Sequence, residues 1–166
     1  FYERTNLTSI EFNNVDTSKT RGMGRMFSGC RGLTSLDLLS FDTNQVTYMG
    51  WMFSGCTNLT SLDLSNFNTS QVTDMRYMFA SDLYGMGKMN LTSLTLGENF
   101  NTNQVTAMRG MFSGCRSLTR LDLSNFETNQ VKDMDEMFYR CESLESLDLS
   151  SFNTKSVEDM NWMFYG

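Results

Sequence analysis

The chain has no histidine and no proline among its 166 residues. Histidine is the commonest general base and the commonest metal ligand, so its absence argues against an enzyme and against a metal site. The absence of proline fits a backbone used for regular stacking. Charged residues make up only 19% of the chain and form no run of one sign, which argues against a disordered tail. No apolar run is long enough to span a bilayer, so we expect no membrane insertion in this segment.

The charge that is present is mostly negative. The formal net charge is −6 and the isoelectric point is near 4.6. Nucleic acids and anionic lipids both require clustered lysine and arginine. We therefore expect neither as a partner, and nothing in the composition indicates a cofactor.

A repeat of 26 residues dominates the sequence. Phe27 follows Phe1, and Phe53 follows Phe27, at this interval, and only the step from Phe79 to Phe112 is longer. Leucine, threonine, valine and two methionine positions keep the same interval. The predicted units are 1–26, 27–52, 53–78, 79–111 with an insertion, 112–137, 138–163, and the start of a seventh at 164–166. Fixed self-similarity of this kind predicts a repeat architecture in which neighbouring units share one core.

Each unit changes its apolar period midway. In the first half, Leu36 and Leu38 follow Leu33 and are two residues apart, and this alternation predicts a short strand. Val46, Met49 and Met52 follow at spacings of three residues, which predicts a short helix. Gly29, Gly55 and Gly114 close that segment, where a left-handed residue is favoured. The predicted fold is therefore an α/β repeat solenoid, a right-handed leucine-rich-repeat-like coil of about six turns, with one short parallel strand and one short helix per turn.

The repeated string MFSGC-x-x-LTSLDLSNF-x-T-x-x-VTDM resembles the BspA-like leucine-rich repeat surface proteins, over the whole chain. The resemblance implies an extracellular or cell-surface protein that acts in adhesion or matrix contact, without catalysis. One departure is clear. The turn position that carries asparagine in ordinary leucine-rich repeats carries phenylalanine here, at Phe41, Phe67, Phe126 and Phe152.

Both ends of the chain fall inside the repeat, without a polar capping sequence. Isolated repeat arrays normally require such caps. Two interpretations follow: a slice of a longer array, which we favour, or a protomer that stacks end to end on neighbouring copies into an extracellular filament.

The cysteines form one column: Cys30, Cys56, Cys115 and Cys141. Neighbours in this column are near enough for a disulfide, but parallel side chains would strain the bridge. We favour buried free thiols that act as small apolar fillers. Because no closely spaced cysteine pair is present, we expect no metal.

The leading candidate for a binding surface is the outward column of the predicted strands. It contains Glu11, Asp37, Asp63, Asp122 and Asp148, with Arg120 beside it. Such a column could attract a basic ligand, or it could be a solvated face. In the resembling family these strands face the concave, partner-binding side.

Two further sets are weaker candidates. The insertion 80–90 offers Leu83, Tyr84, Met86 and Met89 as an adhesive patch or as cover for a neighbouring unit. Sequons occur at Asn6, Asn58, Asn68 and Asn90, and these would be glycan acceptors in a eukaryotic secreted protein. The sequence thus predicts a non-enzymatic extracellular protein that binds a protein or the extracellular matrix.

Overall fold

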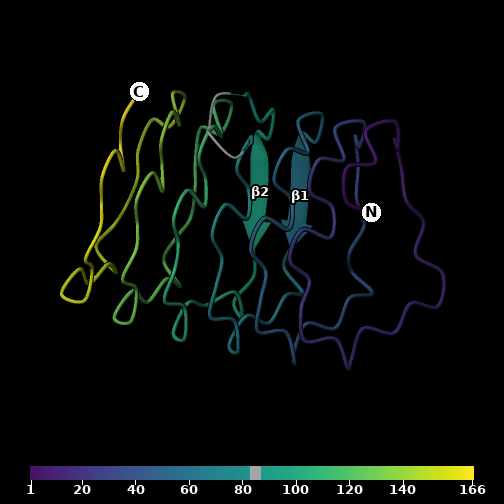
Figure 1. Ribbon diagram of the computed structural model, residues 1–166, viewed down its shortest axis with the longest axis horizontal. Coiled ribbons are helices and arrows are strands. Elements are labelled where there is room, and N and C mark those ends of the chain that lie inside the picture. Colours follow the sequence, from purple (N-terminus) through teal and green to yellow (C-terminus); the bar gives the residue numbers. More distant parts are fainter. Residues whose placement is uncertain (83–86) are drawn as a thin grey trace.

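The computed structural model describes residues 1–82 and 87–166. The repeats form turns that lie side by side along the long axis, with the N-terminal turn at one end and the C-terminal turn at the other (Figure 1). Strand β1 spans Ser61–Leu64 and strand β2 spans Ser93–Leu96; they pair in parallel, with Asp63 opposite Thr95. A second ladder, of single parallel bridges, joins all the turns at Gly22, Tyr48, Asp74, Ala107, Asp133 and Asp159. Repeats equivalent in sequence therefore lie directly over one another.

The predicted helix in each turn is wrong. No helix occurs in the described part of the chain, and in particular none there could cross a membrane. The expected α/β architecture, with a strand and a helix in every unit, is therefore wrong as well. What the structure shows instead is a stack of turns built largely from tight bends and irregular backbone.

The reason lies in where the N–H groups donate. Those of Met49, Trp51 and Phe53 donate to carbonyls of the next turn, at 2.8–3.1 Å. The intervening N–H groups of Met52 and Ser54 donate to the carbonyl three residues earlier, both at 3.2 Å. An α-helix needs every interior N–H for its own i to i−4 bonds. Because every second donor serves the neighbouring turn, this segment forms a series of four-residue bends.

These bends explain why the sequence resembles a helix. Met49 and Met52 are the first and fourth residues of one bend, and both are fully buried. Buried residues three apart therefore arise without any helical backbone. The prediction of a left-handed backbone at Gly29, Gly55 and Gly114 is confirmed, because their φ angles are 74–75°. Each is the third residue of a bend rather than the end of a helix.

A second left-handed position recurs in every turn and is mostly not glycine. It is the third residue of the bend between the two methionines, with φ of 54–58° in all turns. We call this set the left-handed column: Arg25, Trp51, Tyr77, Gly110, Glu136 and Trp162. A positive φ is uncommon for bulky residues, so the hydrogen bonds between turns must impose it.

Within residues 1–82 and 87–166 the leucine segments pair as strands in only two turns, contrary to the expectation of one strand per turn. Parallel strands need a separation of about 4.8 Å. The phenylalanines that follow these segments stack at larger distances, 6.1 Å for Phe100–Phe126 and 6.4 Å for Phe126–Phe152. Outside β1 and β2, the leucine segments of the described ranges keep isolated bonds, such as Glu145 N–H to Thr119 O.

One continuous core runs through the stack. Its centre is a column of parallel phenylalanine rings 5.5–5.8 Å apart, tilted by only 3–10°. The column consists of Phe1, Phe27, Phe53, Phe79, Phe112, Phe138 and Phe164. The methionine, valine and leucine columns pack around it, and most of their side chains are fully buried. Each turn therefore buries its apolar face only through its two neighbours.

A buried threonine ladder links the turns on one side. Thr128 Oγ1 donates to Asn153 O at 3.0 Å and accepts from Asn153 N–H at 2.7 Å. Thr17, Thr43 and Thr102 make the same pair of bonds with the next turn. In the structure each hydroxyl satisfies two backbone groups of the adjacent turn.

We expect Thr128→Val to lower the free energy of unfolding by about 1–3 kcal/mol, because two backbone groups of Asn153 lose their partner at no change in side-chain size. Thr47→Val is the matched control, because Thr47 is exposed and makes a single donor bond, to Arg21 O. We expect it to change stability by less than about 0.5 kcal/mol. Urea unfolding measures both; equal losses would contradict the role of the buried ladder.

Candidate functional site

The outward acidic column is exposed in the structure. Glu11, Asp37, Asp63, Asp122 and Asp148 all face solvent. Arg120 is exposed two residues before Asp122. The stacking of the turns therefore arranges these predicted side chains along one face.

The aspartates of this column also stabilise the backbone. The Oδ1 atoms of Asp37, Asp63, Asp122 and Asp148 accept the N–H two residues later, at 2.8–3.0 Å. These bonds stabilise the bend that ends each leucine segment. Hydrogen bonds from Ser65, Ser124 and Ser150 lower the pKa of Asp63, Asp122 and Asp148, respectively, below the usual value of 3.8. Each carboxylate is therefore exposed and held by the bend that it stabilises.

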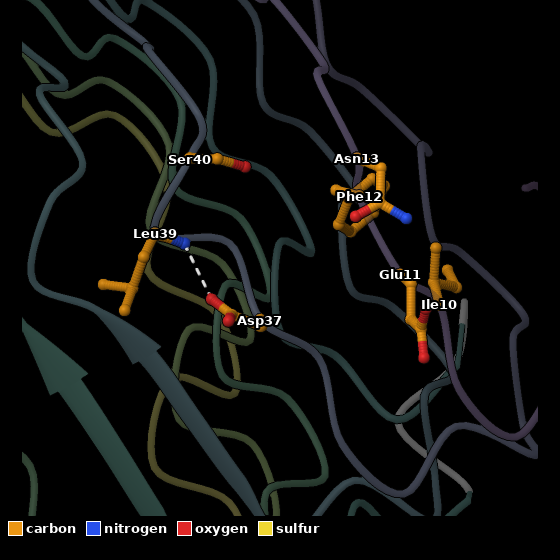
Figure 2. Close-up of a pocket in the computed structure, with 7 residues that line it drawn as sticks. All are labelled: Ile10, Glu11, Phe12, Asn13, Asp37, Leu39 and Ser40. Atoms are coloured by element: carbon orange, nitrogen blue, oxygen red, sulfur yellow. Dashed lines mark hydrogen bonds between the residues drawn. The ribbon is translucent and has the colours of Figure 1, made fainter.

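The first two turns carry a pocket on this face. It has a volume of about 390 Å³ and is lined by residues 10–13 of one turn and by Asp37, Leu39 and Ser40 of the next (Figure 2). Glu11 and Asp37 contribute carboxylates, and Leu39 is 64% exposed. The equivalent position is Ser65, Ser124 or Ser150 in other turns. The pocket therefore combines two acids with an exposed apolar side chain, which the other turns do not repeat. We call it the Leu39 pocket.

The described residues of the insertion 80–90 contribute little to a surface site. Leu83, Tyr84 and Met86 lie outside the described residues. Met89 is fully buried and belongs to the core. Met89 therefore covers the neighbouring turns and is not available to an adhesive patch.

The four sequons differ in accessibility. Asn6 and Asn58 are exposed. Asn68 is held in the stack, because its Nδ2 donates to Asn44 Oδ1 at 2.7 Å and its Oδ1 accepts from Ser70 N–H. Asn90 is half-buried. Of the four side chains, those of Asn6 and Asn58 are therefore the most open to modification.

The cysteines are free and buried. Each thiol donates to the carbonyl of the stacked phenylalanine in the preceding turn, for example Cys56 Sγ to Phe27 O at 3.1 Å. Burial raises the pKa of Cys56 and of Cys141 to about 12, and that of Cys115 well above its usual value. No group of three or more acidic or cysteine side chains suited to a metal ion occurs within residues 1–82 and 87–166.

One surface group of side chains was not predicted from the sequence. Arginines and aromatic rings gather along the left-handed column, where Arg109 Nε donates to Tyr77 Oη at 2.7 Å. Arg109 also pairs with Asp135 at 2.8 Å and with Glu136 at 2.9 Å. Burial raises the pKa of Asp135. In the sequence these positions can be found as the variable residues between the two constant methionines. The backbone is needed to show that they form one surface.

Comparison with known proteins gives one match. A family model described as "Mycoplasma protein of unknown function, DUF285" matches residues 1–84 and again residues 82–166. No curated protein and no solved structure matches the chain. The double match agrees with the internal repeat, since each half contains about three turns.

We expect the exposed aspartates to make stability depend on acid pH. Their pKa is lowered by folding, so their contribution is complete above the unfolded value of 3.8 and is lost as pH falls through the folded pKa. In the triple variant Asp63→Asn, Asp122→Asn, Asp148→Asn, thermal unfolding should depend less on pH below 4. The raised pKa of Asp135 acts in the opposite direction and is common to both proteins. Parallel curves would contradict the assignment.

We also expect the thiols to be unreactive in the folded protein. At pH 8 a thiol-specific disulfide reagent should modify the folded chain only as fast as it unfolds, because Cys56, Cys115 and Cys141 are buried with raised pKa values. In denaturant four thiols per chain should react at once. Rapid reaction without denaturant would show that the stack opens more readily than its packing indicates.

Proposed function

The chain belongs to the DUF285 family of Mycoplasma proteins, and from this premise we propose that it is a non-enzymatic protein of the cell surface that binds a protein or matrix partner. Its repeats resemble those of the BspA-like surface proteins, and this likeness supports an extracellular position and an adhesive role. The binding surface we assign is the Leu39 pocket, at the first two turns of the outward face.

The observation that carries this proposal is the exposure of Leu39 beside two carboxylates. A large apolar side chain that is 64% exposed contributes nothing to the core. Its neighbours Glu11 and Asp37 line the same pocket. A protein partner with a basic side chain next to an apolar one would pair with the acids and cover the leucine. Serine at this position in other turns preserves the fold without offering that contact.

The stacked core supports the same role. Binding costs less when the contacting side chains are already held in place. Asp37 is fixed by the bond from Leu39 N–H at 3.0 Å, so the acid and the apolar side chain keep a constant relation to each other. The pocket therefore offers a preorganised surface of mixed character.

The test is binding of the purified chain to surfaces coated with extracellular-matrix proteins, measured by biolayer interferometry. Leu39→Ser, which installs the residue of three other turns, and Glu11→Gln with Asp37→Asn should each weaken binding about tenfold, or about 1.4 kcal/mol. Asparagine still accepts the bond from Leu39 N–H, so these changes should leave the fold intact.

Asp148→Asn is the matched control, because it makes the same change in the last complete turn, away from the pocket. It should bind as the unaltered chain does. Equal binding by all variants would place the contact elsewhere. Digestion of intact cells with an external protease tests the location: survival of the protein until the cells are lysed would contradict a surface position.

A further inference from the structure

Every glutamine of the chain occupies one column of the repeat. These residues are Gln45, Gln71, Gln104 and Gln130, each directly before a buried valine. We call them the glutamine column. All four side chains are exposed, and none forms a hydrogen bond with another residue in 1–82 or 87–166. The stack therefore presents an unused amide at the same position in four consecutive turns.

Hydroxyl groups accompany these amides two residues further along the chain. Thr47, Thr73 and Thr106 are exposed, and the N–H and the hydroxyl of each donate to one carbonyl of the preceding turn. The next residue of each turn belongs to the ladder of parallel bridges, so successive turns lie about 4.8 Å apart here. The insertion does not interrupt this spacing, because Thr106 N–H still donates to Thr73 O at 2.9 Å. Amides and hydroxyls therefore form two parallel columns.

The three turns at the centre of this surface carry no charge and no aromatic ring. Their segments are 44–47, 70–73 and 103–106, although the chain as a whole has a net charge of −6. Protein interfaces depend most on tryptophan, tyrosine and arginine, and anionic polymers require clustered lysine or arginine. A chain of uncharged sugars instead offers hydroxyl groups, which donate and accept hydrogen bonds as an amide does. The composition of the surface therefore favours a neutral polysaccharide.

The surface is hollowed at the N-terminal end of the glutamine column. A cavity of about 410 Å³ is lined there by Arg21, Asn44, Gln45, Thr47 and Gln71. Its volume is within the range of about 300–1,000 Å³ that is typical of small-molecule sites. The lining offers amide, hydroxyl and guanidinium groups, each of which can bond to a sugar hydroxyl. The cavity can therefore receive one end of a sugar chain that continues along the column.

We propose that the glutamine column binds an uncharged, β-1,4-linked polysaccharide that lies along the stack. Such a polymer is extended and advances per sugar by a distance similar to the separation of the turns, so consecutive sugars contact consecutive amides. Ordering an exposed glutamine costs side-chain entropy, so a single turn binds weakly and affinity requires several turns together. This inference goes beyond the proposed function and uses no residue of the Leu39 pocket.

The probes are glucose, cellobiose, cellotetraose and cellohexaose. Because glutamine occurs only in this column, ¹⁵N label at the glutamine side-chain amides reports on this surface alone. Cellotetraose should shift these signals in a saturable way. Affinity should rise from cellobiose to cellotetraose and gain little with cellohexaose, because four turns carry glutamine. Added salt should leave the affinity unchanged, since the sugar carries no charge.

A double variant tests the central amides. Gln71→Ala with Gln104→Ala should weaken the binding of cellotetraose about tenfold and leave the backbone spectrum of the sugar-free chain unchanged, because both residues are exposed. Asn58→Ala is the matched control. Asn58 is also an exposed amide whose side chain has no hydrogen bond within the described ranges, but it lies outside the column. This control and Leu39→Ser should both bind cellotetraose as the unaltered chain does.

Four outcomes would overturn the proposal. No saturable shift with cellohexaose would leave the glutamine column as a solvated surface. Equal affinity for glucose and cellotetraose would show that no extended chain is recognised. Tighter binding of heparin than of cellotetraose would assign the surface to the cations Arg21 and Lys132 at its ends. Shifts that depend on protein concentration without sugar would assign it to a second copy of the chain. Because the Leu39 variants leave this surface intact, loss of matrix binding and absence of sugar binding are separate results.

Discussion

The structure depends on one set of bonds, the backbone hydrogen bonds that each turn donates to the next. They run from Met49 N–H to Asp74 O, from Met75 N–H to Ala107 O, and onward through the stack. Because these bonds join residues one repeat apart, equal side chains lie over one another. The parallel phenylalanine rings, the threonine ladder and the thiol column all follow from this register. No turn could bury its apolar face or satisfy its backbone alone.

The sequence predicted the register well and the local backbone poorly. The columns of phenylalanine, methionine and leucine were identified as core, and the structure buries most of them. The buried free cysteines and the left-handed Gly29, Gly55 and Gly114 agree with the sequence interpretation. These features depend on side-chain type and repeat length, which the sequence contains directly.

The helix was wrong because apolar spacing does not report hydrogen-bond direction. Met49 and Met52 have helical spacing, but the intervening Trp51 has a φ of 57° and donates to the next turn. Trp, Tyr, Arg and Glu at this position give no warning of a left-handed backbone, since glycine is the usual marker. The strands were overpredicted for a related reason. The alternating leucines report which face of the segment is buried, but not whether neighbouring turns come close enough for their backbones to pair.

The same constraint indicates where specificity resides. Columns that face the core must keep the same residue from turn to turn, because each side chain packs against its own copies. The side chains of the left-handed column lie outside the apolar core, so they are free to differ, and they range from Arg25 to Trp51 to Glu136. Leu39 differs from its serine equivalents in the same way. The Leu39 pocket therefore lies where the residue type departs from the repeat while the backbone keeps the repeated conformation. A repetitive stack acquires a single, specific site only at such positions, because a ligand that recognised the constant residues would bind every turn alike.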